Sequence, residues 1–225
     1  NPYAFTPRTE RMALFHALLG ADLGLPPSRF YAHALAYFDG DPGWDQWGFV
    51  GYQGIADVAV RHADRRLAAA IAHLPLEPLV ALCHCLESVS IDGELRAALL
   101  ARLHASAGQD APPALTAALL RGLAGTGGHP EVTTAVGRLL QTGAGGDIEV
   151  LASIAGRAWE TLDEPAVLHA FLQRLGTNPH GQAAFEQVVT DLLGLPGTAD
   201  TLRQALRSAD VPAAAARAFA RMTER

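Results

Sequence analysis

The chain of 225 residues contains no lysine, only two cysteines and few aromatic residues. All 17 basic residues are arginine, and they are spread along the chain without forming a basic run. Because nonspecific nucleic-acid binding depends on clustered cations that neutralise phosphates, a nucleic-acid partner is not expected. No stretch approaches the roughly 18 unbroken apolar residues that a membrane-spanning helix needs, so no membrane span is expected either. The all-arginine usage is typical of a GC-rich bacterial genome.

The two cysteines, Cys83 and Cys85, lie two residues apart in a predicted helix. At about 100° per residue they point to nearly opposite sides, so they cannot form a disulfide with each other. This favours a reducing compartment, and we expect a cytoplasmic protein. The Cys-His-Cys pattern around His84 does not converge as zinc ligands must, and no second cysteine pair exists. We predict buried cysteines beside a surface histidine, with no metal and no cofactor.

Motifs that carry catalytic chemistry are also missing. The sequence has neither a His-Glu-x-x-His helix nor a Gly-x-Ser-x-Gly elbow. The glycine runs at 125–128 and 143–146 lack the Gly-Lys-Ser/Thr ending of a phosphate loop, so we interpret them as helix ends. No residue is therefore predicted to be catalytic.

A helical hairpin of about 35 residues recurs between residues 76 and 209. Stacked hairpins of this length are the building unit of α-solenoids, in which each hairpin buries its apolar face against its neighbours. The first helices are predicted to open at residues 76–79, 112–115, 148–151 and 181–185. The second helices are predicted to open at Glu94, Glu131, Pro165 and Asp200.

These hairpins predict an all-α fold, specifically a right-handed α-α superhelix of the HEAT-like or ARM-like kind. Apolar residues on the second helices recur with helical spacing and should face inward: Leu95, Leu99 and Leu103; Val132, Val136 and Leu139 or Leu140; Leu168, Phe171 or Leu172, and Leu175. A compact helical bundle is the alternative, because short loops permit it as well.

Residues 1–75 do not follow the repeat, and we predict an aromatic-rich helical region there, continuous with repeats and a capping helix over residues 76–225. Helices are expected at 9–19, from about residue 28 through Phe38, at 47–62 and at 64–74. Gly51 and Gly54 should allow close approach of a neighbour. Side-chain caps are expected at Thr9, Asp64, Asp92, Asp147 and Asp163.

Eleven of the fifteen aromatic residues lie within the first 52 positions. One interpretation is a denser hydrophobic core in this region. The other is an interface, because tryptophan and tyrosine dominate binding energy at protein surfaces. On the second interpretation the candidate binding residues are Trp44, Asp45, Trp47, Phe49 and Tyr52.

Two segments, Trp159 with Leu162-Asp163-Glu164 and the stretch at 48–57, resemble a family of uncharacterised proteobacterial proteins that is noted for a Leu-Asp-Glu motif. Members of that family are longer than this chain, so the resemblance implies that the chain is a C-terminal portion. It implies no activity, and it assigns no role to any residue.

Three functions remain open. The first is a bacterial protein-binding or scaffold module that uses a solenoid groove or the aromatic end. The second is an enzyme whose site is assembled from residues that are distant in sequence. The third is a self-assembling structural protein, which would need an apolar surface on a terminal helix.

Overall fold

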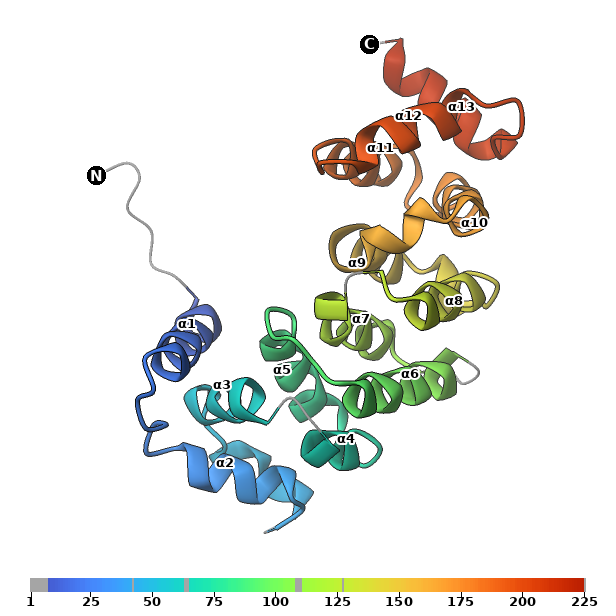
Figure 1. Cartoon of the computed structure of the whole chain (residues 1–225). Helices are drawn as coiled ribbons and strands as arrows, with labels where there is room; N and C mark the ends of the chain where they lie inside the picture. Colours follow the sequence, from blue (N-terminus) through green and yellow to red (C-terminus); the bar gives the residue numbers. More distant parts are fainter. Residues whose placement is uncertain (1–7, 42, 63–64, 108–110, 127, 225) are drawn as a thin grey trace. The chain divides into compact units, whose positions relative to one another are not determined.

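The computed structural model describes residues 8–41, 43–62, 65–107, 111–126 and 128–224 (Figure 1). Across these ranges every regular element is a helix, and no strand occurs. The predicted all-α class is therefore confirmed. The predicted cap at Asp64 lies outside the described residues.

The chain divides into two compact units, Asn1–Arg102 and Leu103–Arg225, called the first and second unit below. The division falls inside one helix, α6, which spans Gly93–Ala107. The predicted change at residue 75 concerns the sequence repeat, and it stays a prediction.

In the first unit α3 (Tyr52–Arg61) packs against three other helices. These are α1 (Thr9–Asp22), α2 (Tyr31–Phe38) and α5 (Leu76–Leu86). The inner face of α3 carries Ile55 and Val58, which are fully buried. Gly54 allows α2 to approach, because a Cβ there would lie 2.6 Å from the Phe30 carbonyl oxygen. The remaining elements are the 3₁₀ helix η1 (Trp44–Phe49) and α4 (Arg65–Ile71).

The predicted single helix over 47–62 is wrong in its first part. Val50 and Gly51 have extended backbone, with ψ of 108° and 144°, and they separate η1 from α3. The close approach expected at Gly51 is also wrong, because a Cβ there would meet nothing within 4 Å. Of these two glycines, Gly54 is the one that a neighbouring segment approaches closely. An extended residue breaks the i to i−4 hydrogen-bond ladder even where apolar residues keep helical spacing.

In the second unit several helices pack on the helix two places along the chain (Figure 1), whereas α10 packs mainly on α13 and α12 mainly on α11. One series is α7, α9 and α11, and the other begins with α8 and α10. A helix packed on its second neighbour is the relation expected of stacked hairpins. The right-handed superhelix itself stays a prediction, as does its bundle alternative. The helices are α7 (Pro113–Gly122), α8 (Pro130–Leu139), α9 (Ile148–Arg157), α10 (Pro165–Gly176), α11 (Gly181–Leu193), α12 (Thr198–Arg207) and α13 (Ala213–Thr223), with 3₁₀ turns η2 (Ala124–Thr126), η3 (Ala144–Gly146) and η4 (Trp159–Asp163).

The predicted helix starts and inner stripes are confirmed. The first helices of the hairpins begin at residues 76, 113, 148 and 181, and the second helices at 93, 130, 165 and 198. The apolar residues expected on the inner stripes are all buried. Two side-chain hydrogen bonds also join segments more than 30 residues apart. Arg174 Nε donates to the Leu140 carbonyl oxygen at 2.7 Å, and Asn178 Nδ2 donates to the Gly146 carbonyl oxygen at 2.9 Å.

Two predicted caps are confirmed and two are wrong. The Asp92 and Asp147 carboxylates accept backbone N–H bonds from Leu95 and Glu149, each at 2.8 Å. Thr9 instead lies inside the first turn of α1, where its backbone is already helical. Asp163 ends η4, and the residue that precedes α10 is Glu164.

Candidate functional site

The predicted aromatic site is organised by Tyr37, a residue that the sequence did not single out. Its fully buried ring meets Trp44 edge-on, with centroids 5.3 Å apart, and Trp47 at 5.9 Å. Its hydroxyl donates to the Trp44 carbonyl oxygen at 3.0 Å. The end of α2 is therefore bonded to η1 by both ring packing and a hydrogen bond.

Trp44 and Trp47 are half-buried, so they both hold the turn and reach the surface. Burial raises the pKa of Tyr37, and the negative charge of Asp45 raises it further. A neutral phenol is the form that donates to the Trp44 carbonyl, so the raised pKa of Tyr37 preserves this bond further into the alkaline range.

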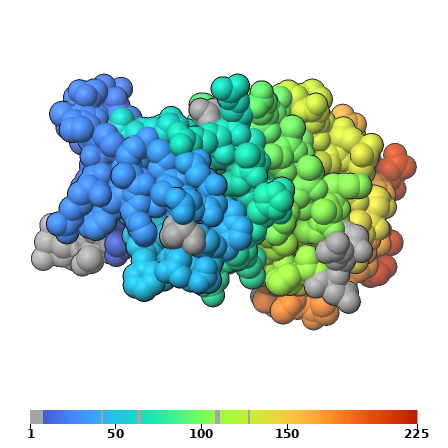
Figure 2. Space-filling view, turned by 90° about the horizontal axis from the view of Figure 1, so that it is seen from below, coloured from blue at the N-terminus to red at the C-terminus, as the bar shows by residue number. Residues whose placement is uncertain are grey.

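Phe49 differs from the two tryptophans because its side chain is 75% exposed. Asp45 is exposed as well, and it accepts a hydrogen bond from Gln46 Nε2 at 2.8 Å. The segment that carries η1 lies at the surface of the first unit (Figure 2). The structure thus presents one aromatic ring and one carboxylate outward from a turn that Tyr37 holds.

Tyr52 belongs to a different environment. It is half-buried in the first turn of α3, and burial raises the pKa of its phenol, with smaller contributions from Glu10 and Cys85. These two groups lie on α1 and α5, so Tyr52 faces those helices. Among the described residues no ring contact joins Tyr52 to the tryptophans. The structure therefore separates it from the other four predicted residues.

A charged pair joins α4 to Asp39, the residue that follows α2. Arg66 Nε and Nη2 donate to the two carboxylate oxygens of Asp39 at 2.9 and 2.6 Å. The hydrogen bond from Arg66 holds the pKa of Asp39 below its usual value. A bidentate pair fixes orientation as well as distance, so α4 restrains Asp39 at the C-terminal end of α2.

Sequence reasoning also missed a polar group beside α3. The buried Asp57 carboxylate accepts from the Ser28 backbone N–H at 3.0 Å, and Arg61 lies 4.0 Å from its other oxygen. The Tyr31 ring stacks on His62, and its hydroxyl is hydrogen-bonded to that imidazole. A carboxylate amid the apolar residues of 55–59 was a usable signal, because acids are rarely buried without partners.

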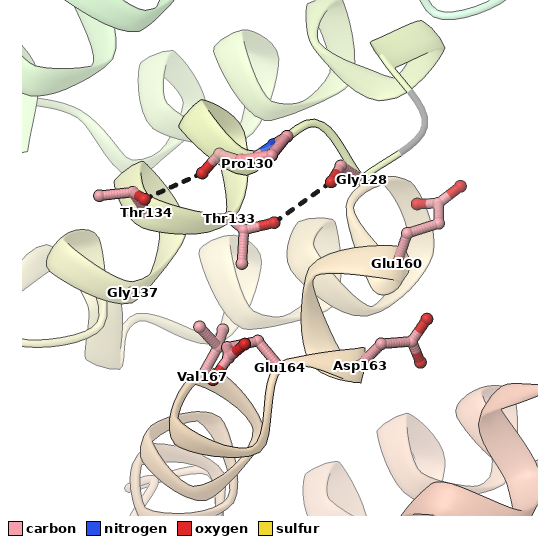
Figure 3. A pocket seen from close by; sticks show the side chains of 9 residues that line it. All are labelled: Gly128, Pro130, Thr133, Thr134, Gly137, Glu160, Asp163, Glu164 and Val167. Atoms are coloured by element: carbon pink, nitrogen blue, oxygen red, sulfur yellow. Dashed lines mark hydrogen bonds between the residues drawn. The ribbon is translucent and has the colours of Figure 1, made fainter.

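The second unit contains a concave pocket of about 680 Å³ (Figure 3). It lies between α8 and the η4–α10 junction, and three acids line it, Glu160, Asp163 and Glu164. The Thr133 hydroxyl donates to the backbone carbonyl of Gly128, and that of Thr134 to the backbone carbonyl of Pro130. The remaining lining residues are Pro130, Gly137 and Val167.

The chemistry of this pocket is that of an open, acidic surface. Its described lining holds carboxylates and threonine hydroxyls, and it holds no histidine, thiol or basic side chain. Both threonine hydroxyls donate to backbone carbonyls, so neither is hydrogen-bonded to a lining carboxylate as a nucleophile is to its general base. The junction that the sequence indicated as a helix start supplies two of its acids, because Asp163 and Glu164 flank the turn into α10.

Both cysteines are buried, as predicted, and neither is in a disulfide. Burial raises the pKa of the Cys85 thiol to about 12, and the Glu10 carboxylate contributes in the same direction. Over the described ranges no group of three or more histidine, cysteine or acidic residues is arranged to hold a metal ion. Within the same ranges, none of the helices combines the length and the apolar character that crossing a bilayer requires.

Comparison with known protein families gives a match over nearly the whole chain. The family model for a protein of unknown function, DUF3549, matches residues 1–223. The chain belongs to this family. No curated protein and no solved structure matches the chain. Membership of DUF3549 agrees with the expected uncharacterised family, and it brings no activity with it.

Proposed function

We propose that this DUF3549 chain is a protein-binding module that docks a partner through the surface of Phe49. The observation that carries the proposal is where the exposed large apolar side chains lie. Among the described residues all of them fall between positions 15 and 49, in the first unit. Exposed large apolar side chains mark interaction sites, because their burial on a partner releases water, and Phe49 is the most exposed of them at 75%.

Phe49 is the best-placed contact residue of that region. It ends η1, whose backbone is held by the Tyr37 hydroxyl and by packing on Trp44 and Trp47. The Asp39–Arg66 pair holds the loop before it. A ring presented on a held turn loses little conformational freedom on binding, and this favours affinity.

The flanking charges define the partner that fits. Asp41 and Asp45 are exposed on either side of Trp44. The partner is therefore a protein that offers an apolar pocket for Phe49 and a basic rim for the two carboxylates. Electrostatic complementarity of this kind acts mainly on specificity and association rate.

The wider proposal is a cytoplasmic scaffold or adaptor in a bacterium, with the hairpins as its frame. Neither Cys83 nor Cys85 is in a disulfide, and this suits a reducing compartment. The neighbour relation of the helices in the second unit supports a repeat architecture, which commonly serves as a binding surface.

The test places a photo-crosslinking phenylalanine at position 49 of the full chain in the organism that encodes it. A matched probe at the exposed Ala152 of α9, in the second unit, is the control. The proposal expects a protein joined at position 49 and not at 152. The purified pair should then lose about 10- to 100-fold affinity with Phe49→Ala, as expected of a central aromatic contact.

Two further variants make the result specific. Asp45→Lys should lower the affinity of the chain for the same partner, and the loss of affinity should be smaller at high salt. Leu25→Ala removes another exposed apolar side chain of the first unit and should leave the affinity unchanged. The proposal would be refuted if Phe49→Ala left the affinity for the partner unchanged. It would also be refuted if the probes at positions 49 and 152 crosslinked the same protein equally.

A further inference from the structure

Helix α1 has two apolar faces, and the described residues of the first unit cover only one of them. Ala13 and Ala17 are buried where α1 packs on α3, and Gln53 Nε2 of α3 donates to the Ala13 carbonyl oxygen at 3.2 Å. On the opposite side Phe15 is 56% exposed and Leu19 is 44% exposed. A helix that is apolar on both sides normally has a partner on both sides.

The uncovered face carries opposite charges at its two ends. Arg11 precedes Phe15 by one turn, and Asp22 follows Leu18 by one turn. The four residues are spaced i, i+4, i+7 and i+11, which places them on one stripe of the helix. Arg11 and Asp22 are both exposed, and the part of the chain that the structure describes supplies neither with an ion pair or a side-chain hydrogen bond.

The stripe on one copy of α1 is complementary, in charge and in apolar pattern, to the stripe on a second copy that runs in the opposite direction. In an antiparallel pair of α1 helices related by a two-fold axis, Phe15 meets Leu18 of the second copy. The same register places Arg11 beside Asp22 of the second copy, and the symmetry repeats both contacts. A parallel pair would instead bring the two Arg11 side chains together. Charge and apolar pattern therefore select one arrangement.

We infer that the Arg11–Phe15–Leu18–Asp22 stripe of α1 is a homodimer interface, occupied by α1 of a second copy in antiparallel orientation. Burial of Phe15, Leu18 and Leu19 from both copies supplies most of the driving force. The two Arg11–Asp22 contacts fix orientation and register, as exposed charge pairs do at an interface rim. The interface does not use Phe49, so the inference is independent of the proposed protein-binding surface.

The first experiment measures mass by sedimentation equilibrium on the full chain over a wide range of concentrations. The inference expects a monomer–dimer equilibrium. Phe15→Asp and Leu18→Asp should each abolish the dimer, because a carboxylate would be buried at its centre. Leu25→Asp, at an exposed apolar position outside α1, should leave the dimer intact. Circular dichroism on each variant checks that the helices are retained.

The second experiment tests the antiparallel register. Arg11→Glu places two like-charge contacts in the dimer, and so does Asp22→Arg, so each should weaken dimerisation about tenfold. An equimolar mixture of the two single variants should recover wild-type dimerisation as a heterodimer. In that heterodimer the glutamate introduced at position 11 of one chain would face the arginine introduced at position 22 of the other. Native mass spectrometry distinguishes the heterodimer from the two homodimers after the variants are mass-labelled.

Three results would overturn the inference. The first is a wild-type chain that stays monomeric at the highest concentration. The second is a dimer that Phe15→Asp leaves unchanged. The third is a mixture of charge variants that dimerises no better than either variant alone.

Discussion

The second unit buries its large apolar side chains between helices, whereas the first unit leaves several of its own at the surface. Phe171 and Phe185 of the second unit are almost fully buried. In the first unit Phe15 and Phe49 are more than half exposed, although Tyr37 of the same unit is fully buried. A phenylalanine in one unit therefore holds the fold, and in the other it is free to meet a partner.

The difference follows from how the helices are covered. In the second unit α9, α10 and α11 each pack on helices that precede and follow them in the chain, so their apolar stripes are covered on both sides. In the first unit α1 contacts mainly α3, and η1 contacts mainly α2. Elements with fewer neighbours leave a face open, and that is where the two proposed interfaces lie.

The largest expected effect contrasts two phenylalanines. Phe185→Ala should lower the free energy of unfolding by about 3–5 kcal/mol, because it removes a buried ring and leaves a cavity. Phe49→Ala should change it by less than about 0.5 kcal/mol, because its ring is already in water. Urea unfolding followed by circular dichroism measures both. Equal losses for the two variants would contradict the contrast between the units.

Both units contain a glycine at which a neighbouring segment approaches too closely to leave room for a side chain. A Cβ on Gly54 would lie 2.9 Å from the Ala34 Cβ, and one on Gly176 would lie 2.5 Å from the Ala215 nitrogen. Gly54→Ala and Gly176→Ala should each cost about 1–3 kcal/mol, since backbone must move to make room. Gly20→Ala and Gly156→Ala, which meet nothing within 4 Å, are the matched controls. They should stabilise by up to about 1 kcal/mol through helix propensity.

Alkaline pH should weaken the first unit more than the second, because both cysteines lie in the first unit. The pKa of Cys85 is raised from 9.0 to about 12 in the folded state. Above pH 9 the unfolded thiol ionises while the folded thiol does not, so stability is complete below pH 9 and falls between pH 9 and 12. At pH 10 the loss from this group is about 1.4 kcal/mol.

Urea unfolding of wild type and Cys85→Ala, compared at pH 8 and pH 10, measures this loss. Tyr37 and Tyr52 also have raised pKa values and are present in both proteins, so their titration cancels in the difference except for the smaller contribution that Cys85 makes to Tyr52. An identical pH dependence of the two proteins would show that the thiol is not responsible.

The smallest effect tests how firmly η1 is held. Tyr37→Phe keeps the ring packing and removes the hydrogen bond to the Trp44 carbonyl, so it should cost about 0.5–1.5 kcal/mol. The fluorescence of Trp44 and Trp47 should change, while that of Trp159 in the second unit should not. Single-tryptophan variants read at each position separate the two units. An unchanged spectrum at Trp44 would mean that the bond does not position the turn.

The predicted site was only partly assembled by the fold. Trp44, Trp47, Asp45 and Phe49 share η1, as their closeness in sequence required. Tyr52 follows η1 by three residues but faces α1 and α5, because the extended Val50 and Gly51 redirect the chain. The pocket beside α10 joins segments about 30 residues apart, and no local pattern could reveal it.

The sequence by itself determined the all-helical class, the starts of the hairpins and the apolar stripes. These depend on the 3.6-residue period and on residues near in the chain, so they can be read locally. Only the tertiary structure decided which apolar faces are covered. Phe15 and Phe171 have the same hydrophobicity, and the number of helices packed around each determines that one is exposed and the other buried.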